Sequence, residues 1–312
     1  MHPFHLKIVS LMVGQTFKKL KARKPTRMKT LRNLSIFAYL FLLFLIPLSA
    51  EAIPPPSPAG GNYLALDGVD DHAVLDFETF GLLLPKGTDE FTFEAWIYPT
   101  TLPNEDDIIA TVLSQQVRMY AWDRGPNAGL RLMGGAHLDH PVRPGAMAFG
   151  FLKFSLKQWN HIAFQSKGTQ TVLIVNGLGR AIPGGTTLAD DLSHAGHPQD
   201  FTIGGFGEKI KSVIHGGHFW GHFAGYIDEV RISKVARYNI AKRRFTPLTK
   251  FKNDAKTVAL WHFDEPMGTR AFSDTSGNAY QLVGKNGAET GGEFAAVEAV
   301  GKLAMIWGRL KR

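Results

Sequence analysis

The stretch Phe91–Pro99, which reads FTFEAWIYP, decides the fold class because its residue types alternate with a period of two. Successive side chains of a β-strand point to opposite faces of the sheet. One face is apolar and consists of Phe91, Phe93, Ala95 and Ile97. The other face consists of Thr92, Glu94, Trp96 and Tyr98. This pattern predicts a strand of an antiparallel sheet that packs one face on a hydrophobic core.

Short runs of the same kind recur along the chain and are separated by turn residues. We expect further strands at 108–113, 116–122, 130–133, 149–154, 159–166, 171–176, 201–204, 223–233 and 257–263. Asn176-Gly177 follows the run TVLIV and predicts a tight hairpin turn. The 33 Gly and 17 Pro among 312 residues fit many turns, and helix is expected only as a turn near 236–243. The sequence therefore predicts an all-β sandwich.

The net charge of +8 is concentrated at the start of the chain. Residues 1–52 hold nine Lys and Arg against a single acid, Glu51, whereas residues 53–312 hold 26 basic and 26 acidic residues. The body of the protein therefore has no charge excess with which to bind nucleic acid. The absence of cysteine excludes disulfides, thiolate metal sites and cysteine nucleophiles.

Residues 28–52 have the pattern of a secretory signal peptide. Two basic residues precede an apolar run at 34–46, which is followed by Pro47 and then by small residues. We assign residues 1–52 to a leader in which Met28 is the expected start. The protein is accordingly expected to be secreted or extracytoplasmic.

Cleavage of the leader is expected after Ala50 or Ala52. The alternative is an uncleaved membrane anchor, because the uncharged stretch 33–50 just reaches the length that spans a bilayer. Residues 53–61, which read IPPPSPAGG, form a Pro/Gly linker to the domain that follows.

Several signatures then occur in a fixed order: YLALDGVDDHAVL, FTFEAWIYP, WNHIAFQ, TVLIVNG, FTIGG, GYIDEVRISKVARY and VALWHFDE. Together they resemble a laminin-G-like domain of the concanavalin A-like lectin/glucanase type of secreted bacterial proteins. The resemblance covers Asn62–Pro247 with a related tail, so that 62–287 form the expected domain and 288–312 a C-terminal tail. It implies a jelly-roll sandwich of two antiparallel sheets. Members of the family bind carbohydrate or protein, often with a structural calcium ion, and a minority of the superfamily are glycoside hydrolases.

The segment 258–277 resembles the start of a further domain of this kind. We expect it to supply an edge strand that completes the sandwich, and the alternative is the stub of a lost repeat.

An acidic turn near the start of the domain is the first candidate calcium site. Asp67, Asp70 and Asp71 crowd a turn that contains Gly68, and calcium prefers carboxylate and carbonyl oxygens. The alternative is that these acids cap the turn by accepting hydrogen bonds from backbone N–H groups.

Asp228 is the second candidate metal ligand. Simple alternation along its strand places it on the same face as Val230 and Ile232, where a carboxylate needs a partner or a metal. The run DEVRI also resembles the DYVRV strand of laminarinase-type glycoside hydrolases, in which the Asp holds calcium together with backbone carbonyls. The resemblance and the turn together nominate the metal ligands Asp228, Asp67, Gly68 and Asp71. The alternative is an ion pair between Asp228 and an arginine.

Aromatic rings beside polar side chains are the groups on which sugars stack. The candidate ligand-binding residues are Tyr120, Trp122 and Arg124 at the end of one expected strand, and His218 and Trp220 in the segment 215–222. The alternative is that these rings belong to the core, which we expect for Trp96.

Catalytic and zinc motifs are weak in this sequence. Glycoside hydrolysis needs two carboxyl groups roughly 5–10 Å apart, but the chain has no E-x-D-x-x-E string and Glu94 is a lone acid on its strand. The histidines His215, His218 and His222 are separated by glycines, which disfavours a zinc site.

The sequence therefore favours a secreted, non-catalytic β-sandwich that binds a glycan or an extracellular protein, with calcium as the expected ion. A glycoside hydrolase of the same superfamily is the alternative, and a protein-binding adhesion module is another. No nucleic-acid partner is expected, and contact with a membrane is expected only through an uncleaved leader.

Overall fold

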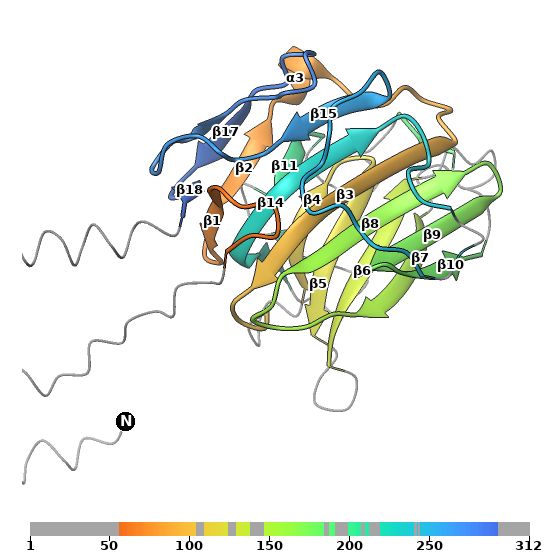
Figure 1. Ribbon diagram of the computed structural model, residues 1–312, viewed down its shortest axis with the longest axis horizontal. Coiled ribbons are helices and arrows are strands. Elements are labelled where there is room, and N and C mark those ends of the chain that lie inside the picture. The colour runs from red at the N-terminus through yellow and green to blue at the C-terminus, as the bar shows by residue number, and fades with distance from the viewer. Residues whose placement is uncertain are drawn as a thin grey trace, which may run out of the picture. The chain divides into compact units, whose positions relative to one another are not determined.

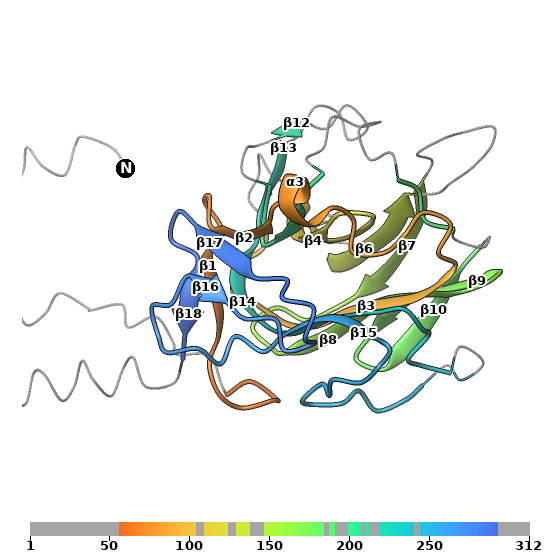
Figure 2. The same ribbon diagram turned by 90° about the horizontal axis from the view of Figure 1, so that it is seen from above.

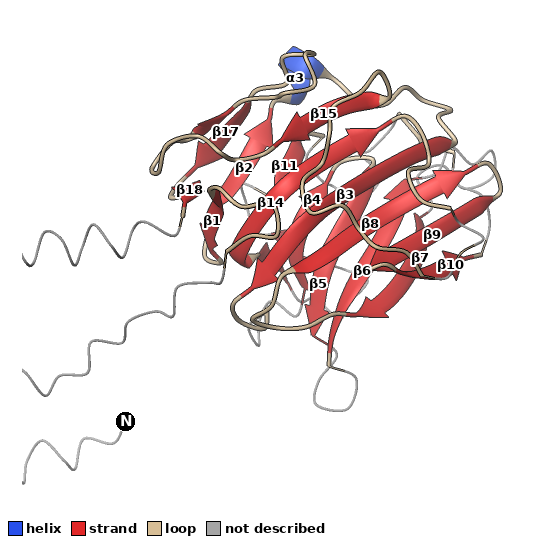
Figure 3. Cartoon of the chain, viewed as in Figure 1, coloured by secondary structure: helices blue, strands red, loops and turns tan. Residues whose placement is uncertain are grey.

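The computed structural model describes residues 56–103, 109–123, 129–137, 147–183, 187–190, 199–206, 210–211, 219–239, 242 and 244–292. The leader, the first residues of the linker and the tail after 292 lie outside the described residues, as do Arg124 and His218. The described residues form two β-sheets that face each other (Figures 1 and 3), with the short helix α3 (Phe77–Phe80) beside them. The expected all-β sandwich of jelly-roll type is confirmed.

Sheet A contains the strand formed by the alternating stretch Phe91–Pro99. Its strands are β1 (Tyr63–Asp67), β3 (Glu90–Pro99), β8 (Asn160–Lys167), β9 (Gln170–Val175), β10 (Leu178–Ile182), β14 (Ala224–Ser233), β15 (Thr257–Trp261) and β18 (Glu289–Gly291). The strand order is β10-β9-β8-β3-β14-β1-β18, and all neighbours are antiparallel. β1 pairs with the first half of β14 and β15 with its second half.

Sheet B lies opposite sheet A, and Figure 2 shows the two as separate layers. Its strands are β2 (His72–Leu75), β4 (Ile109–Ser114), β5 (Val117–Asp123), β6 (Leu130–His137), β7 (Met147–Lys153), β11 (Phe201–Ile203), β12 (Ile210–Lys211), β13 (Phe219–His222), β16 (Ala271–Phe272) and β17 (Leu282–Lys285). The order is β16-β17-β2-β11-β4-β5-β6-β7. β13 pairs with β12 and runs parallel to β4, whereas the other pairs are antiparallel.

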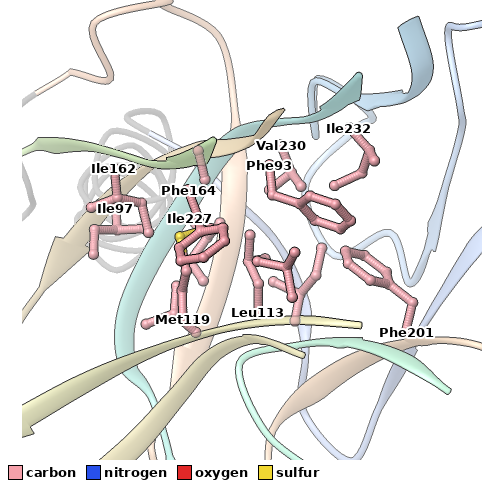
Figure 4. Close-up of a cluster of buried hydrophobic side chains, with 14 of the residues drawn as sticks. Phe93, Ile97, Leu113, Met119, Ile162, Phe164, Phe201, Ile227, Val230 and Ile232 are labelled. Carbon is pink, nitrogen blue, oxygen red and sulfur yellow. The ribbon is translucent and has the colours of Figure 1, made fainter. Parts of the chain in front are cut away.

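The core lies between the sheets and is built by alternate residues of both (Figure 4). Sheet A supplies Phe93, Ile97, Ile162, Phe164 and Ile227, and sheet B supplies Leu113, Met119 and Phe201. The prediction that Phe91, Phe93, Ala95 and Ile97 form the core face of one strand is confirmed, because all four are fully buried in this cluster.

The prediction that Asp228 shares a face with Val230 and Ile232 is wrong. A β-bulge between Asp228 and Arg231 shifts the register of β14 against β3, so that two residues oppose one. Glu229 adopts a positive φ of 53° at this point. Val230 and Ile232 therefore point into the core with Ile227, while Asp228 and Arg231 point to the outer face of sheet A.

The ends of the domain extend further than the sequence indicated. Residues 258–277 complete this sandwich, as expected, since β15 pairs with β14 and Trp261 is fully buried. β18 pairs with β1 and continues the domain to Gly291, beyond the expected boundary at 287. At the other end Ser57 of the linker is buried against the domain.

Local turn chemistry accounts for one hairpin and for the short helix. Asn176 and Gly177 have positive φ values of 49° and 74° between β9 and β10, as predicted for the tight turn. Helix α3 was not expected and begins after Asp76, whose carboxylate accepts a hydrogen bond from the Thr79 N–H. The described residues of 236–243 are not helical, and 240, 241 and 243 lie outside the described residues. Among the described residues, no helix is long and apolar enough to cross a membrane.

The core makes a direct prediction. Phe164→Ala should lower the free energy of unfolding by about 3–5 kcal/mol, because this fully buried ring stacks on Phe91 and its removal leaves a cavity. Phe149→Ala is the matched control, since Phe149 is 39% exposed and should lose about 0.5 kcal/mol or less. Urea unfolding of the three proteins measures both values. Equal stability of the two variants would contradict the core described here.

Candidate functional site

The outer face of sheet B, which is turned away from the core, carries polar and aromatic side chains at its centre. On β5 these residues alternate with the core positions, and on β4 they flank a register shift at which Val112 and Leu113 both face the core. We call the following residues the outer-face cluster: Thr111 and Ser114 of β4, Arg118 and Tyr120 of β5, Thr202 of β11 and Trp220 of β13. All of them are buried.

Strand pairing holds the members of the cluster side by side. Ser114 lies opposite Arg118, and Thr111 lies opposite Tyr120. The ring centroids of Tyr120 and Trp220 are 5.0 Å apart. The guanidinium carbon of Arg118 lies 5.9 Å from the centroid of the Trp220 ring. One patch thus combines a cation, several hydroxyl groups and aromatic rings.

Arg118 and the hydroxyl-bearing members of the cluster have buried polar atoms without a hydrogen-bond partner among the described residues. No hydrogen bond of ordinary geometry reaches the Arg118 guanidinium or the hydroxyls of Thr111, Ser114, Tyr120 and Thr202 in the described part of the chain. Burial raises the pKa of Tyr120 to about 12, although the nearby Arg118 and Ser114 oppose this. Burial also lowers the pKa of Arg118. Since buried polar groups are normally hydrogen-bonded, this patch is the best candidate for a binding site.

The structure brings some of the expected ligand-binding residues to this face. Tyr120 and Trp220 belong to the cluster but are buried, so neither offers a broad ring face to solvent. Trp122 is half-buried at its margin, with its ring 5.2 Å from that of Phe151. Sequence reasoning missed Arg118. Its signal was present, because it alternates with Tyr120 and Trp122 on one strand.

The acidic turn after β1 brings three of the acids together. One carboxylate oxygen from each of Asp67, Asp70 and Asp71 lies within 4.8 Å of the others. Asp67 also accepts a hydrogen bond from the Val69 N–H, as the turn-capping alternative requires. Burial raises the pKa of Asp71, and the negative charges of Asp67 and Asp70 raise it further. Hydrogen bonds from the backbone N–H groups of Asp67 and Gly287 lower it only in part. Three carboxylates this close together are ligands that suit a hard cation such as calcium.

Gly68 shapes this turn. Its φ is 79°, and an added Cβ would lie 2.5 Å from the Cβ of Ala224, so only glycine fits there. Gly68 and Asp67 also line a small hollow that reaches His222 of β13. The acidic turn therefore lies at the rim of sheet B.

Asp228 does not join this acidic turn. Asp67 pairs with Ala224, four residues before Asp228 on β14. The buried Asp228 carboxylate instead accepts hydrogen bonds from the Ser57 hydroxyl and from the Glu229 N–H. Burial raises the pKa of Asp228 well above its usual value, which the hydrogen bond from Ser57 opposes only in part. Asp228 is thus a separate position that a proton or a cation would neutralise.

Glu94, the lone acid considered for catalysis, lies on the outer face of sheet A and is fully buried. Its Oε1 accepts hydrogen bonds from Arg231 at 2.8 Å and 2.7 Å, and its Oε2 accepts one from the Tyr238 hydroxyl at 2.5 Å. His161 lies 3.3 Å from Oε2. Burial alone would raise the pKa of Glu94, but these partners bring it below its ordinary value. The carboxylate is therefore committed to internal partners.

Comparisons with known proteins agree with this architecture. A family model described as the concanavalin A-like lectin/glucanases superfamily matches residues 67–239. No curated protein matches the chain significantly.

Three solved structures are similar to this chain. A Bacteroides ovatus protein that is assigned a carbohydrate-binding role has 18% identity and a TM-score of 0.47, over 75% of this chain and 61% of its own. Domains LG4-5 of the mouse laminin alpha1 chain have 14% identity and a TM-score of 0.35, over 65% and 48%. Domain 4 of an extracellular arabinanase from Geobacillus stearothermophilus, solved with arabinotriose, has 19% identity and a TM-score of 0.30, over 49% and 66%.

The buried pair on sheet A gives the second prediction. Glu94→Gln should lower the free energy of unfolding by about 3–5 kcal/mol, because it leaves the Arg231 charge buried without a counter-ion. Since the folded-state pKa of Glu94 is below its ordinary 4.5, the wild type holds this advantage above pH 4.5 and loses it as the pH falls through the folded-state value. Thermal melts of both proteins from pH 8 to pH 3 measure the difference. A variant as stable as the wild type at pH 7 would contradict the pairing.

Proposed function

Because this chain belongs to the concanavalin A-like lectin/glucanases superfamily, we propose that it is an exported, non-catalytic module that binds a glycan on the outer face of sheet B. The observation that carries the proposal is the outer-face cluster, in which the Arg118 guanidinium and four buried hydroxyls beside aromatic rings have no hydrogen-bond partner among the described residues. Glycan binding uses this combination, because sugar rings stack on aromatic faces while their hydroxyls need hydrogen-bonding partners.

The margin of the cluster supplies the stacking surface. Trp122 and Phe151 lie on adjacent rows of the same face, are both half-buried and contact each other. A pyranose ring resting there would place its substituents over the buried polar groups of β4 and β5. The protein then contributes orientation and specificity, and no bond of the ligand is broken.

The environment of Glu94 supports the non-catalytic assignment. A general acid or nucleophile must reach the glycosidic bond. Glu94 lies on sheet A, away from the proposed site, and is fully enclosed by Arg231, His161 and Tyr238. Freeing it would break the most extensive buried polar network of sheet A described above. A hydrolase would therefore need carboxylates other than Glu94.

Export and calcium complete the proposal. The pattern of residues 1–52 supports export by a signal peptide. The acidic turn supports a calcium ion held by Asp67, Asp70 and Asp71, which would fix the rim of sheet B beside the ligand. Asp228 with Ser57 is the alternative position for that ion.

The third prediction concerns the stacking surface. On a glycan array, the full chain should bind at least one class of oligosaccharide and leave it uncleaved. Trp122→Ala should weaken that binding about tenfold, the effect of losing one ring contact of roughly 1.4 kcal/mol. Trp159→Ala, which removes a half-buried ring that packs against Tyr98 of sheet A, should bind as the wild type does.

Thermal melts first establish that both tryptophan variants are folded. Loss of binding in Trp159→Ala alone would place the site on the wrong sheet. Cleavage of the bound glycan by wild-type protein would contradict the non-catalytic assignment.

The fourth prediction concerns calcium. Protein purified with a chelator should gain thermal stability as calcium is added, because a ligand that binds only the folded state raises the melting midpoint. Asp70→Asn should abolish this gain without lowering the midpoint in chelator, since the Asp70 side chain is exposed and removing its charge relieves repulsion. Asp89→Asn, a change at another exposed acid, should leave the gain intact.

The position of the ion is read from the same titration. A gain that survives Asp70→Asn but is lost in Asp228→Asn would move the ion to Asp228. The absence of any gain up to millimolar calcium would contradict the metal site.

A further inference from the structure

We infer that the outer-face cluster takes an acidic glycan, one that contains uronic acid, and that Arg118 binds its carboxylate. This inference rests on the proposed function, because it names the class of glycan that the same face of sheet B would bind. It comes from the contrast between two buried arginines and from the rows of side chains that cross the sheet.

Two arginines are buried among the described residues, and their surroundings are opposite. Arg231, on the outer face of sheet A, donates hydrogen bonds to the Glu94 carboxylate. It also donates one to the Lys252 carbonyl oxygen, 3.1 Å away. Arg118, on the outer face of sheet B, is fully buried, yet none of its three guanidinium nitrogens has a hydrogen-bond partner in the described part of the chain. Its neighbours are the Trp220 ring and the Tyr120 hydroxyl, neither of which carries a negative charge. A buried cation requires an anion, so Arg231 is complete and Arg118 is not.

No residue of the adjoining strands supplies that anion. Arg118 lies opposite Ser114 of β4 and Gly135 of β6. The acid of its own strand is Asp123, which lies opposite the core residue Leu130. Asp123 is therefore not on the same face of the sheet as Arg118. The described residues around the guanidinium are thus hydroxyl-bearing, aromatic or glycine. The missing negative charge must come from outside these strands.

The cross-strand neighbours of Arg118 on sheet B would let a ligand approach it from the β6 side. In its row the residues run Ser114, Arg118, Gly135 and Phe149. Gly135 has no side chain, and Phe149 beyond it is 39% exposed. The guanidinium is therefore bordered on the β6 side by backbone, with an exposed ring next to it.

The outer margin of the same face is basic. In the row that begins at Ile109, the residues that follow are Trp122, Arg131 and Lys153. Lys153 is exposed, and Arg131 is half-buried. A chain of acidic sugars that stacks on Trp122 would meet positive charge at this margin as well as at Arg118, which favours a polyanionic glycan over a neutral one.

The shape of the guanidinium selects a carboxylate. Its planar fork of N–H donors matches the two oxygens of a carboxylate in a bidentate pair. A uronic acid carries that carboxylate on an arm outside the pyranose ring, so the group can be inserted toward Arg118 while the ring stays at the aromatic margin. The hydroxyls of Ser114, Thr111 and Thr202 are then available to the remaining lone pairs and ring hydroxyls.

Titration calorimetry on the full chain tests the inference. The probes are trimers of galacturonate, glucuronate and mannuronate, each paired with its methyl ester, which has the same ring without the charge. Wild-type protein should bind at least one acid ten times more tightly than its ester or better. Arg118→Gln should remove this preference, and Arg118→Lys should restore only part of it because it lacks the fork. Arg270→Gln, a change of an exposed arginine elsewhere, should leave the preference unchanged.

A second measurement keeps the test independent of the sugar chosen. Arg118→Met in the absence of any ligand should melt at the same temperature as the wild type or higher, because it removes an unpaired buried cation. A strong fall in the melting midpoint would mean that the guanidinium has a structural partner, and it would overturn the inference.

The outcomes separate this inference from the proposed function. Equal binding of acid and ester, or binding of a sulfated oligosaccharide without uronic acid in preference to every uronate, would overturn the carboxylate assignment and leave glycan binding standing. Failure to bind any glycan would overturn both. Binding of an acidic peptide through Arg118 with no glycan bound would also overturn both.

Discussion

A charge that is removed from water must be neutralised nearby, and the Glu94–Arg231 pair is the interaction on which the outer face of sheet A depends. It joins the central strands β3 and β14 and draws in His161 of β8 and Tyr238 of the segment after β14. The Arg231 guanidinium also lies 4.6 Å from the Phe251 ring centroid. The chain thereby closes its own outer face on this side.

The outer face of sheet B also holds a buried arginine, but no carboxylate partner for it is found among the described residues. The inner face of each sheet forms the core, and the proposed function assigns recognition to the outer face of sheet B. There the chain supplies a buried cation and hydroxyls but, among the described residues, no anion to complete them. A ligand that carries the missing charge would complete on sheet B what Glu94 completes on sheet A. The proposed function therefore places the internal ion pair on sheet A and ligand binding on sheet B.

The sequence predicted what depends on period-two alternation and turn chemistry. The core face of Phe91–Pro99 and the hairpin at Asn176-Gly177 are set by neighbouring residues, so both were predictable. The orientation of Asp228 was not, because the bulge at Glu229 arises from pairing with a strand far away in sequence. The burial of Tyr120 and Trp220 likewise depends on packing between distant segments. The role proposed for Arg118 emerges only when its neighbours across β4 and β6 are known.

A crystal structure of the full chain with a bound uronic-acid oligosaccharide tests the central claim most directly. The sugar ring should lie against Trp122 on the outer face of sheet B, with a carboxylate within hydrogen-bond distance of the Arg118 guanidinium. A sugar bound on the outer face of sheet A, against Tyr226 and Trp159, with Arg118 still lacking a partner, would contradict it.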